Sequence, residues 1–200
     1  RIEKLTHDVV AVHVELDRPL AFQAGQFIVM RAPGIAGYRA YSMVNFAPRT
    51  AALELVLKRK PGGKFCDWIF AGGATGAYLE WFGPLGKATF DPGEERTMLA
   101  IAGGSGIASI MSILALGHET RHFDHFDAAV FFGVRGNEDV FYGERLNAHA
   151  ASFGERLAVT VALSHEEPSE ETRRRYPALA FASGFVHEVA GREMASRTAG

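Results

Sequence analysis

The sequence contains a single cysteine, Cys66, among its 200 residues. One thiol cannot form an intrachain disulfide, and it cannot supply the four cysteine ligands of a structural zinc or iron–sulfur site. Scarce cysteine is typical of proteins kept in a reducing compartment, so we expect a cytoplasmic location.

The chain also lacks an excess of charge of one sign, since it contains 21 Lys and Arg residues and 23 Asp and Glu residues. Proteins that bind nucleic acid through its phosphates need a basic surplus, so we expect no nucleic-acid partner. No run approaches the roughly 18 apolar residues that span a bilayer, so we expect no membrane partner. The sequence opens at Arg1 without a methionine or a signal-peptide core, which indicates a piece of a longer chain.

What the sequence does contain falls into two patterns. The first ninety residues hold short β-type runs at 9–16, 26–30 and 53–58, separated by Gly/Pro turns and one short helix candidate. Short strands separated by Gly/Pro turns favour a small antiparallel β-barrel. A polar turn at 91–95 marks the change of pattern, so we expect domains at 1–93 and 94–200.

The second pattern alternates strands and helices. Strand-like runs at 97–102, 128–132 and 157–163 are separated by helical runs at 107–116 and 142–153. This spacing predicts right-handed βαβ units on a parallel sheet. The expected fold is therefore an antiparallel β-barrel followed by an α/β parallel-sheet nucleotide-binding domain.

Three short clusters carry chemistry. In Arg39-Ala40-Tyr41-Ser42, strand alternation points Arg39 and Tyr41 the same way, and these side chains suit a phosphate and a planar ring. Gly62-Gly63 opens a short helix whose amides could cradle an anion. Taken alone, the first cluster is more often a solvated strand edge, and the second is equally well a hairpin loop.

The third cluster is a glycine turn between a strand and a helix, at residues 102–108. It is not the full dinucleotide fingerprint, because Ser109 stands where the third Gly or Ala belongs. In an α/β sheet, however, ligands bind at the carboxyl ends of strands, which is where this turn lies.

In order along the chain, these clusters resemble the motifs of the ferredoxin–NADP reductase superfamily. The resemblance rests on five segments: Arg39-Ala40-Tyr41-Ser42, Gly62-Gly63, Gly83-Pro84-Leu85-Gly86, residues 102–108 and Phe132-Gly133-Val134-Arg135. Their spacing is most similar to that of reductase components of bacterial aromatic-ring dioxygenases and multicomponent monooxygenases.

The resemblance implies a flavin site in the barrel. Tyr41 would stack on the isoalloxazine, Arg39 would neutralise the phosphates, and Ser42 would hydrogen-bond near the ring nitrogen that receives hydride. The pyrophosphate would be held by a glycine turn and helix start, Gly62, Gly63, Lys64, Phe65 and Cys66. Cys66 replaces the usual Ser or Thr and is a weaker hydrogen-bond partner. FAD is expected, with FMN as the alternative.

The resemblance also implies a nicotinamide site in the α/β domain. Its residues would be Gly103, Gly104, Ser105, Gly106, Gly133 and Arg135, with Ser105 in place of the commoner Thr. The stretch Ser164-His165-Glu166-Glu167 offers two carboxylates where NADPH-using members often carry Ser-Arg. Like charge repels a 2′-phosphate, so NADH is expected, with NADPH left open by Arg135.

The function implied is an NAD(P)H-dependent flavin oxidoreductase that passes electrons to an iron–sulfur ferredoxin domain or an oxygenase component. A [2Fe-2S] cluster would lie outside this sequence. The family's Cys-Gly-Pro-Pro segment is not matched between residues 178 and 200, so the α/β domain is expected to be incomplete. The alternatives are a non-catalytic docking or regulatory domain, and a reductase that serves a haem or another acceptor.

Other polar and aromatic groups favour structural roles. His118, His122 and His125 are expected on a solvated surface and not around a metal. Trp68 and Trp81 are expected to be core residues or to pack at an end of the barrel. The charged stretch 166–175 is expected to be an exposed loop or helix face.

Overall fold

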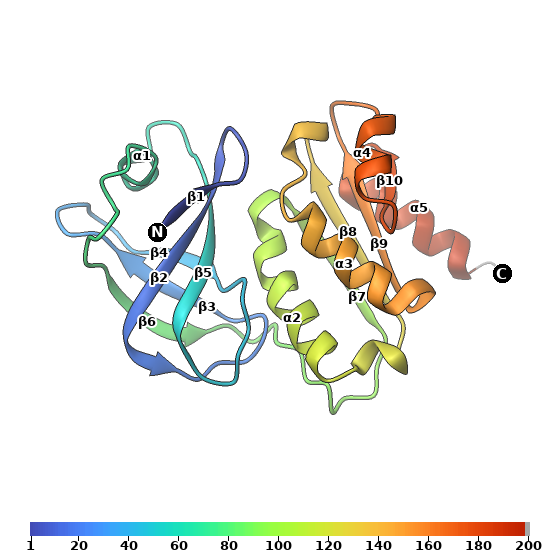
Figure 1. Ribbon diagram of the computed structural model, residues 1–200, viewed down its shortest axis with the longest axis horizontal. Coiled ribbons are helices and arrows are strands. Elements are labelled where there is room, and N and C mark those ends of the chain that lie inside the picture. The colour runs from blue at the N-terminus through green and yellow to red at the C-terminus, as the bar shows by residue number, and fades with distance from the viewer. Residues whose placement is uncertain (199–200) are drawn as a thin grey trace. The chain divides into compact units, whose positions relative to one another are not determined.

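The computed structural model describes residues 1–198, which form two compact units (Figure 1). The first unit comprises residues 1–91 and 108–116, and the second comprises 92–107 and the chain from 117 onward. The boundary expected between residues 93 and 94 stays a prediction.

Antiparallel strands build the first unit, as predicted. Two three-stranded sheets have the orders β1-β2-β5 and β4-β3-β6, and a bridge between Met43 and Leu55 links them. The elements are β1 (Ile2–Lys4), β2 (Val9–Leu20), β3 (Phe27–Arg31), β4 (Arg39–Ser42), β5 (Thr50–Lys58), α1 (Lys64–Phe70) and β6 (Glu80–Leu85).

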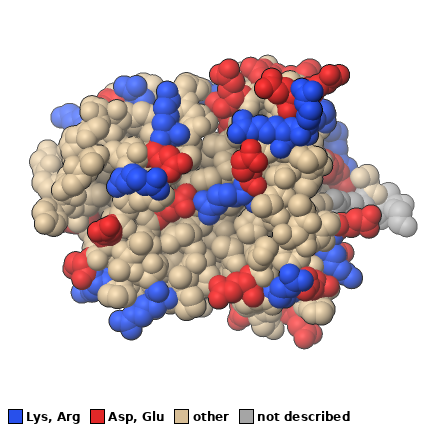
Figure 2. All heavy atoms as spheres, viewed as in Figure 1, with Lys and Arg blue, Asp and Glu red and all other residues tan. Residues whose placement is uncertain are grey.

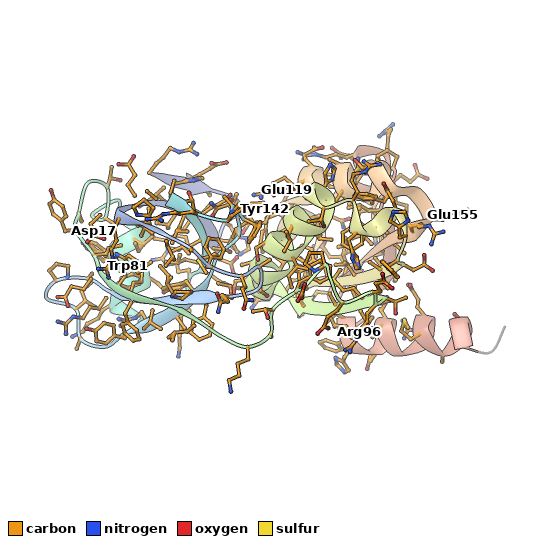
Figure 3. All side chains as sticks on the ribbon, turned by 90° about the horizontal axis from the view of Figure 1, so that it is seen from below. Asp17, Trp81, Arg96, Glu119, Tyr142 and Glu155 are labelled. Carbon is orange, nitrogen blue, oxygen red and sulfur yellow. The ribbon has the colours of Figure 1, made fainter. Side chains whose placement is uncertain are left out.

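The core of this unit follows from strand alternation. In β3, Ile28 and Met30 are fully buried, whereas the alternate residues Phe27, Val29 and Arg31 are half-buried. Burying one such side chain contributes about 1.5–3 kcal/mol to stability. Trp68 and Trp81 pack half-buried against this core, as expected, and Figure 3 marks Trp81 within the barrel.

The second unit contains a four-stranded parallel sheet of order β10-β9-β8-β7, which confirms the α/β prediction. Its strands are β7 (Met98–Gly103), β8 (Ala128–Val134), β9 (Leu157–Leu163) and β10 (Ala180–Ser183). The helices after residue 92 are α2 (Ile107–Glu119), most of which belongs to the first unit, and α3 (Gly143–Phe153), α4 (Glu170–Arg175) and α5 (Val186–Thr198). Four short 3-10 turns accompany them: η1 (Gly104–Gly106), η2 (His122–Asp124), η3 (Asn137–Asp139) and η4 (Gly154–Arg156).

Helices α3 and α5 lie on opposite faces of this sheet (Figures 1 and 3). Under α5 the sheet presents small side chains such as Ala129 and Ala162. A Cβ on Gly133 would lie 2.8 Å from Cβ of Val186, so glycine at this position allows the helix to approach the strand. Among the described residues, no helix is long and apolar enough to cross a membrane.

The expectation of a solvated histidine surface is wrong for two of the three residues. His122 is 5% exposed, because η2 turns its ring inward, and its Nε2 lies 3.1 Å from the carbonyl oxygen of Arg96. His118 is half-buried, with its ring 5.3 Å from that of His149. His125 is exposed, as expected.

The charged stretch 166–175 is exposed along most of its length, as expected. Helix α4 begins at the cap residue Ser169, whose Oγ accepts a hydrogen bond from the amide of Thr172. Acidic residues occupy its first turn and arginines its last, an order that complements the helix dipole. Figure 2 shows both signs of charge side by side over this helix.

Candidate functional site

A pocket of about 480 Å³ opens in the first unit. It joins two clusters that are separate in the sequence, the arginine–tyrosine strand and the glycine turn. Its lining residues are Arg39, Tyr41, Lys58, Lys60, Pro61, Gly62, Gly63 and Cys66. The first two come from β4, and the others come from the end of β5, the turn that follows it and the first turn of α1.

Strand alternation places Arg39 and Tyr41 on the same side, as the sequence predicted. Strand β4 pairs with β3 in the register Arg39 with Met30 and Tyr41 with Ile28. Ala40, between them, is exposed on the other side. Both predicted side chains therefore line one pocket, whereas Ser42 is not among its lining residues.

The Arg39 guanidinium is held in place by its own loop. Nη1 donates a hydrogen bond to the Gly37 carbonyl oxygen at 2.7 Å, and Nη2 donates one to that of Ala36 at 3.1 Å. The guanidinium also lies over the Phe65 ring, 5.0 Å from its centroid. Because a guanidinium has five N–H groups, donors remain for an anion in the pocket.

Tyr41 presents a fixed aromatic face. Its ring stacks on the fully buried ring of Phe65, with centroids 6.0 Å apart and an angle of 25° between the planes. Burial raises the pKa of Tyr41, with a smaller contribution from Cys66, although Arg39 acts in the opposite direction. The phenol therefore stays protonated and uncharged at neutral pH.

The glycine turn has the backbone geometry of an anion cradle. Gly62 adopts a φ of +73°, which disfavours other residues. The amide of Gly63 donates to the Lys60 carbonyl oxygen at 2.9 Å and closes the turn. The first helical bond of α1 runs from the Asp67 amide to the Gly63 carbonyl at 2.9 Å. The amides of Lys64 and Phe65 precede it, so the helix itself offers them no acceptor.

Sequence reasoning missed Lys58 and Lys60, which add two positive charges beside Arg39. Lys58 ends β5 and Lys60 lies in the turn that follows, so strand alternation does not cover both and no local pattern identified them. No carboxylate is among the residues that line the pocket, but Lys58 Nζ lies 3.4 Å from Asp8 Oδ2. The thiol of Cys66 donates to the Lys58 carbonyl oxygen at 3.6 Å. The pocket is therefore positively charged, although Asp8 partly neutralises Lys58.

In the second unit, the predicted nicotinamide residues gather at the carboxyl ends of β7 and β8. Gly103 and Gly133 are register partners there. Gly104 and Ser105 follow in η1, and Gly104 has a φ of +52°. A Cβ on Gly103 or Gly104 would meet no atom within 4 Å, so the space at the carboxyl end of β7 is open.

The loops that follow β8 and β9 are tied by a carboxylate. Glu166 accepts hydrogen bonds from the backbone amide and Nδ2 of Asn137, both at 2.9 Å, and these bonds lower the pKa of Glu166. A Cβ on Gly136 would lie 2.6 Å from Glu166 Cδ. Arg135 is exposed on the same loop, and Glu167 accepts a hydrogen bond from Ser183 at the end of β10. Two carboxylates therefore stand at this edge of the sheet.

Comparison with known proteins identifies two family models along the chain. The family model described as "Oxidoreductase FAD-binding domain" matches residues 1–90, and the one described as "Oxidoreductase NAD-binding domain" matches residues 100–195. A reductase component of naphthalene 1,2-dioxygenase/salicylate 5-hydroxylase systems from Ralstonia sp. is 31% identical over 194 residues, which are 96% of this chain and 55% of that protein. The ferredoxin–NAD(+) reductase component of the alkene monooxygenase system of Xanthobacter autotrophicus is 36% identical over 75% of this chain and 45% of its own length.

Solved structures agree as well. A cytochrome P450 reductase from Amycolatopsis superposes with a TM-score of 0.81 at 31% identity, over 96% of this chain and 55% of that chain. The ferredoxin reductase in carbazole 1,9a-dioxygenase gives a TM-score of 0.73 at 28% identity, over 95% of this chain and 54% of that chain. The chain thus spans about half the length of these relatives.

Proposed function

The chain belongs to the ferredoxin–NADP reductase superfamily, and from this premise we propose that it is the FAD- and NADH-binding part of a reductase that supplies electrons to an oxygenase system. The observation that carries the proposal is the positive pocket that joins Arg39 and Tyr41 to the glycine turn. We further propose that the flavin domain ends at residue 93 and that the nicotinamide domain begins at residue 94.

The lining of the pocket fits FAD. Three cations suit a pyrophosphate, and the side of Tyr41 away from Phe65 offers a flat surface to an aromatic ring. Bound FAD would supply the chemistry, accepting a hydride from reduced nicotinamide and passing the two electrons on one at a time.

Each predicted residue then has a task of its own. Arg39 holds the phosphates, and Tyr41 orients the ring while its raised pKa keeps negative charge away. Ser42 offers a hydroxyl at the end of β4, near where the reacting edge of the ring would lie. The turn supplies Gly62, Gly63 and the backbone around Lys64, Phe65 and Cys66.

The open edge of the parallel sheet is proposed to bind the nicotinamide nucleotide. Gly103, Gly104 and Gly106 let a ligand approach the backbone closely, and Ser105 supplies a hydroxyl. Gly133 and Arg135 belong to the neighbouring strand end. The carboxylates of Glu166 and Glu167 disfavour a 2′-phosphate, which supports NADH over NADPH.

The electron acceptor is proposed to be an iron–sulfur ferredoxin domain or an oxygenase component, with a [2Fe-2S] cluster held outside this sequence. The names of the reductase-component relatives support this class of acceptor. The likeness to a cytochrome P450 reductase favours a second candidate, a reductase whose electrons reach a haem.

The visible absorption spectrum of the purified chain with added FAD tests the proposal. We expect flavin absorbance to remain with the protein after gel filtration, and to bleach under anaerobic NADH faster than under NADPH at equal concentration. A protein that retains neither FAD nor FMN would refute the flavin assignment and favour a docking domain. Faster bleaching with NADPH would refute the NADH preference alone.

A further inference from the structure

The buried ring of Phe65 contacts both side chains that the flavin pocket takes from β4. The Arg39 guanidinium lies 5.0 Å from its centroid, and the Tyr41 ring stacks on it at 6.0 Å. Phe65 belongs to a different element, the first turn of α1, and it does not line the pocket. One ring outside the pocket lining therefore packs against both of these pocket side chains.

These contacts restrict how Arg39 and Tyr41 can move. A guanidinium over an aromatic face is attracted to the π-system, and stacked rings prefer an offset, nearly parallel arrangement. The carbonyl oxygens of Ala36 and Gly37 accept hydrogen bonds from the same guanidinium. Side chains that are ordered before binding lose less entropy when a ligand arrives.

We infer that Phe65 is a positioning residue of the flavin pocket, whose side chain fixes the orientation of Arg39 and Tyr41. This role is separate from the role expected for its backbone amide. The inference rests on the proposed function, since it concerns how tightly the same pocket binds FAD.

The competing explanation is that Phe65 only fills the barrel core. Its ring also lies 5.9 Å from that of Trp68, at a tilt of 48°, and it belongs to the buried cluster. Ile69 is a matched control for that explanation. It is 1% exposed, lies in the same cluster on the same helix, and has no ring on which Arg39 or Tyr41 could rest.

The test compares FAD dissociation constants of Phe65→Leu and Ile69→Val, two changes that remove similar volume from the core, each alone and combined with Arg39→Ala, by fluorescence titration at fixed salt. We expect Phe65→Leu to weaken binding about tenfold, which corresponds to about 1.4 kcal/mol. In the Arg39→Ala background the same change should cost only about threefold, because the part that acts through Arg39 is gone. Ile69→Val should change binding less than twofold in either background.

The fluorescence of bound flavin at saturation gives a second readout, and it should rise in Phe65→Leu as the tyrosine face loosens. Phe65→Met, which has no ring and whose unbranched side chain can adapt to the space, replaces Phe65→Leu if the latter fails to fold by circular dichroism. Equal weakening by the Phe65 and Ile69 variants, or a Phe65 effect of the same size with and without Arg39, would overturn the inference. Wild-type protein that binds no FAD would instead overturn the proposed function, and the inference with it.

Discussion

Gly62 and Gly72 form a matched pair that separates binding from stability. Both have a positive φ, +73° and +80°, and a Cβ on either would meet no atom within 4 Å. Alanine at either position therefore suffers backbone strain alone, about 1–2 kcal/mol for a left-handed residue. Gly62 lines the positive pocket, whereas Gly72 follows α1 and is not among the lining residues.

We expect both alanine variants to lower the free energy of unfolding of the first unit by the same amount. For a unit of this size, each kcal/mol shifts Tm by about 4–8 °C. Only Gly62→Ala should weaken FAD binding, by about tenfold or 1.4 kcal/mol, because the strained turn displaces the amides beside the pocket. Calorimetry measures the first quantity, and flavin titration well below Tm measures the second.

Two results would refute this reasoning. If Gly72→Ala weakened FAD binding as much as Gly62→Ala did, affinity would be following global stability and not the turn. If neither variant changed affinity while both lost stability, the glycine turn would not contact the flavin phosphates.

Three other expectations test the pocket and the half-buried His149. Arg39→Ala should weaken FAD binding by about 1.5–3 kcal/mol. The control Arg59→Ala removes a surface ion pair with Asp67 at 3.3 Å and should leave the FAD dissociation constant nearly unchanged. Similar losses of affinity in both variants would contradict the role assigned to Arg39. Cys66, the single thiol, lines the pocket, so saturating FAD should slow its alkylation several-fold, and an unchanged rate would place the flavin elsewhere. Burial, together with the nearby His118, lowers the pKa of His149 from 6.5 to about 4. As the pH drops from 6.5 toward 4, the His149 ring is therefore protonated in the unfolded chain but not in the folded one, and the free energy of unfolding falls. Urea midpoints at pH 7 and pH 5 should reveal this loss, and His149→Phe should reduce it; an equal loss in the variant would contradict the reasoning.

Local patterns were enough to predict the elements and part of the site. Period-two alternation predicted that Arg39 and Tyr41 share a side, and the strand–turn–helix pattern located β7 and α2 with an error of three residues or fewer at each end. Taken together and in order, the motifs resemble those of a known family, and that resemblance predicted the two cofactor classes that the family models bear out. These features depend on residues close together in sequence, so the chain displays them before it folds.

The sequence by itself thus determined the order of the elements, the family and the chemistry of the motifs. Only the tertiary structure decided that Lys58 and Lys60 stand beside Arg39, that Phe65 supports both β4 side chains, and that His122 turns inward. The physical reason is that these contacts join separate strands, helices and turns. Hydrophobic burial and strand register bring such segments together, and no local periodicity records which side chains will then meet.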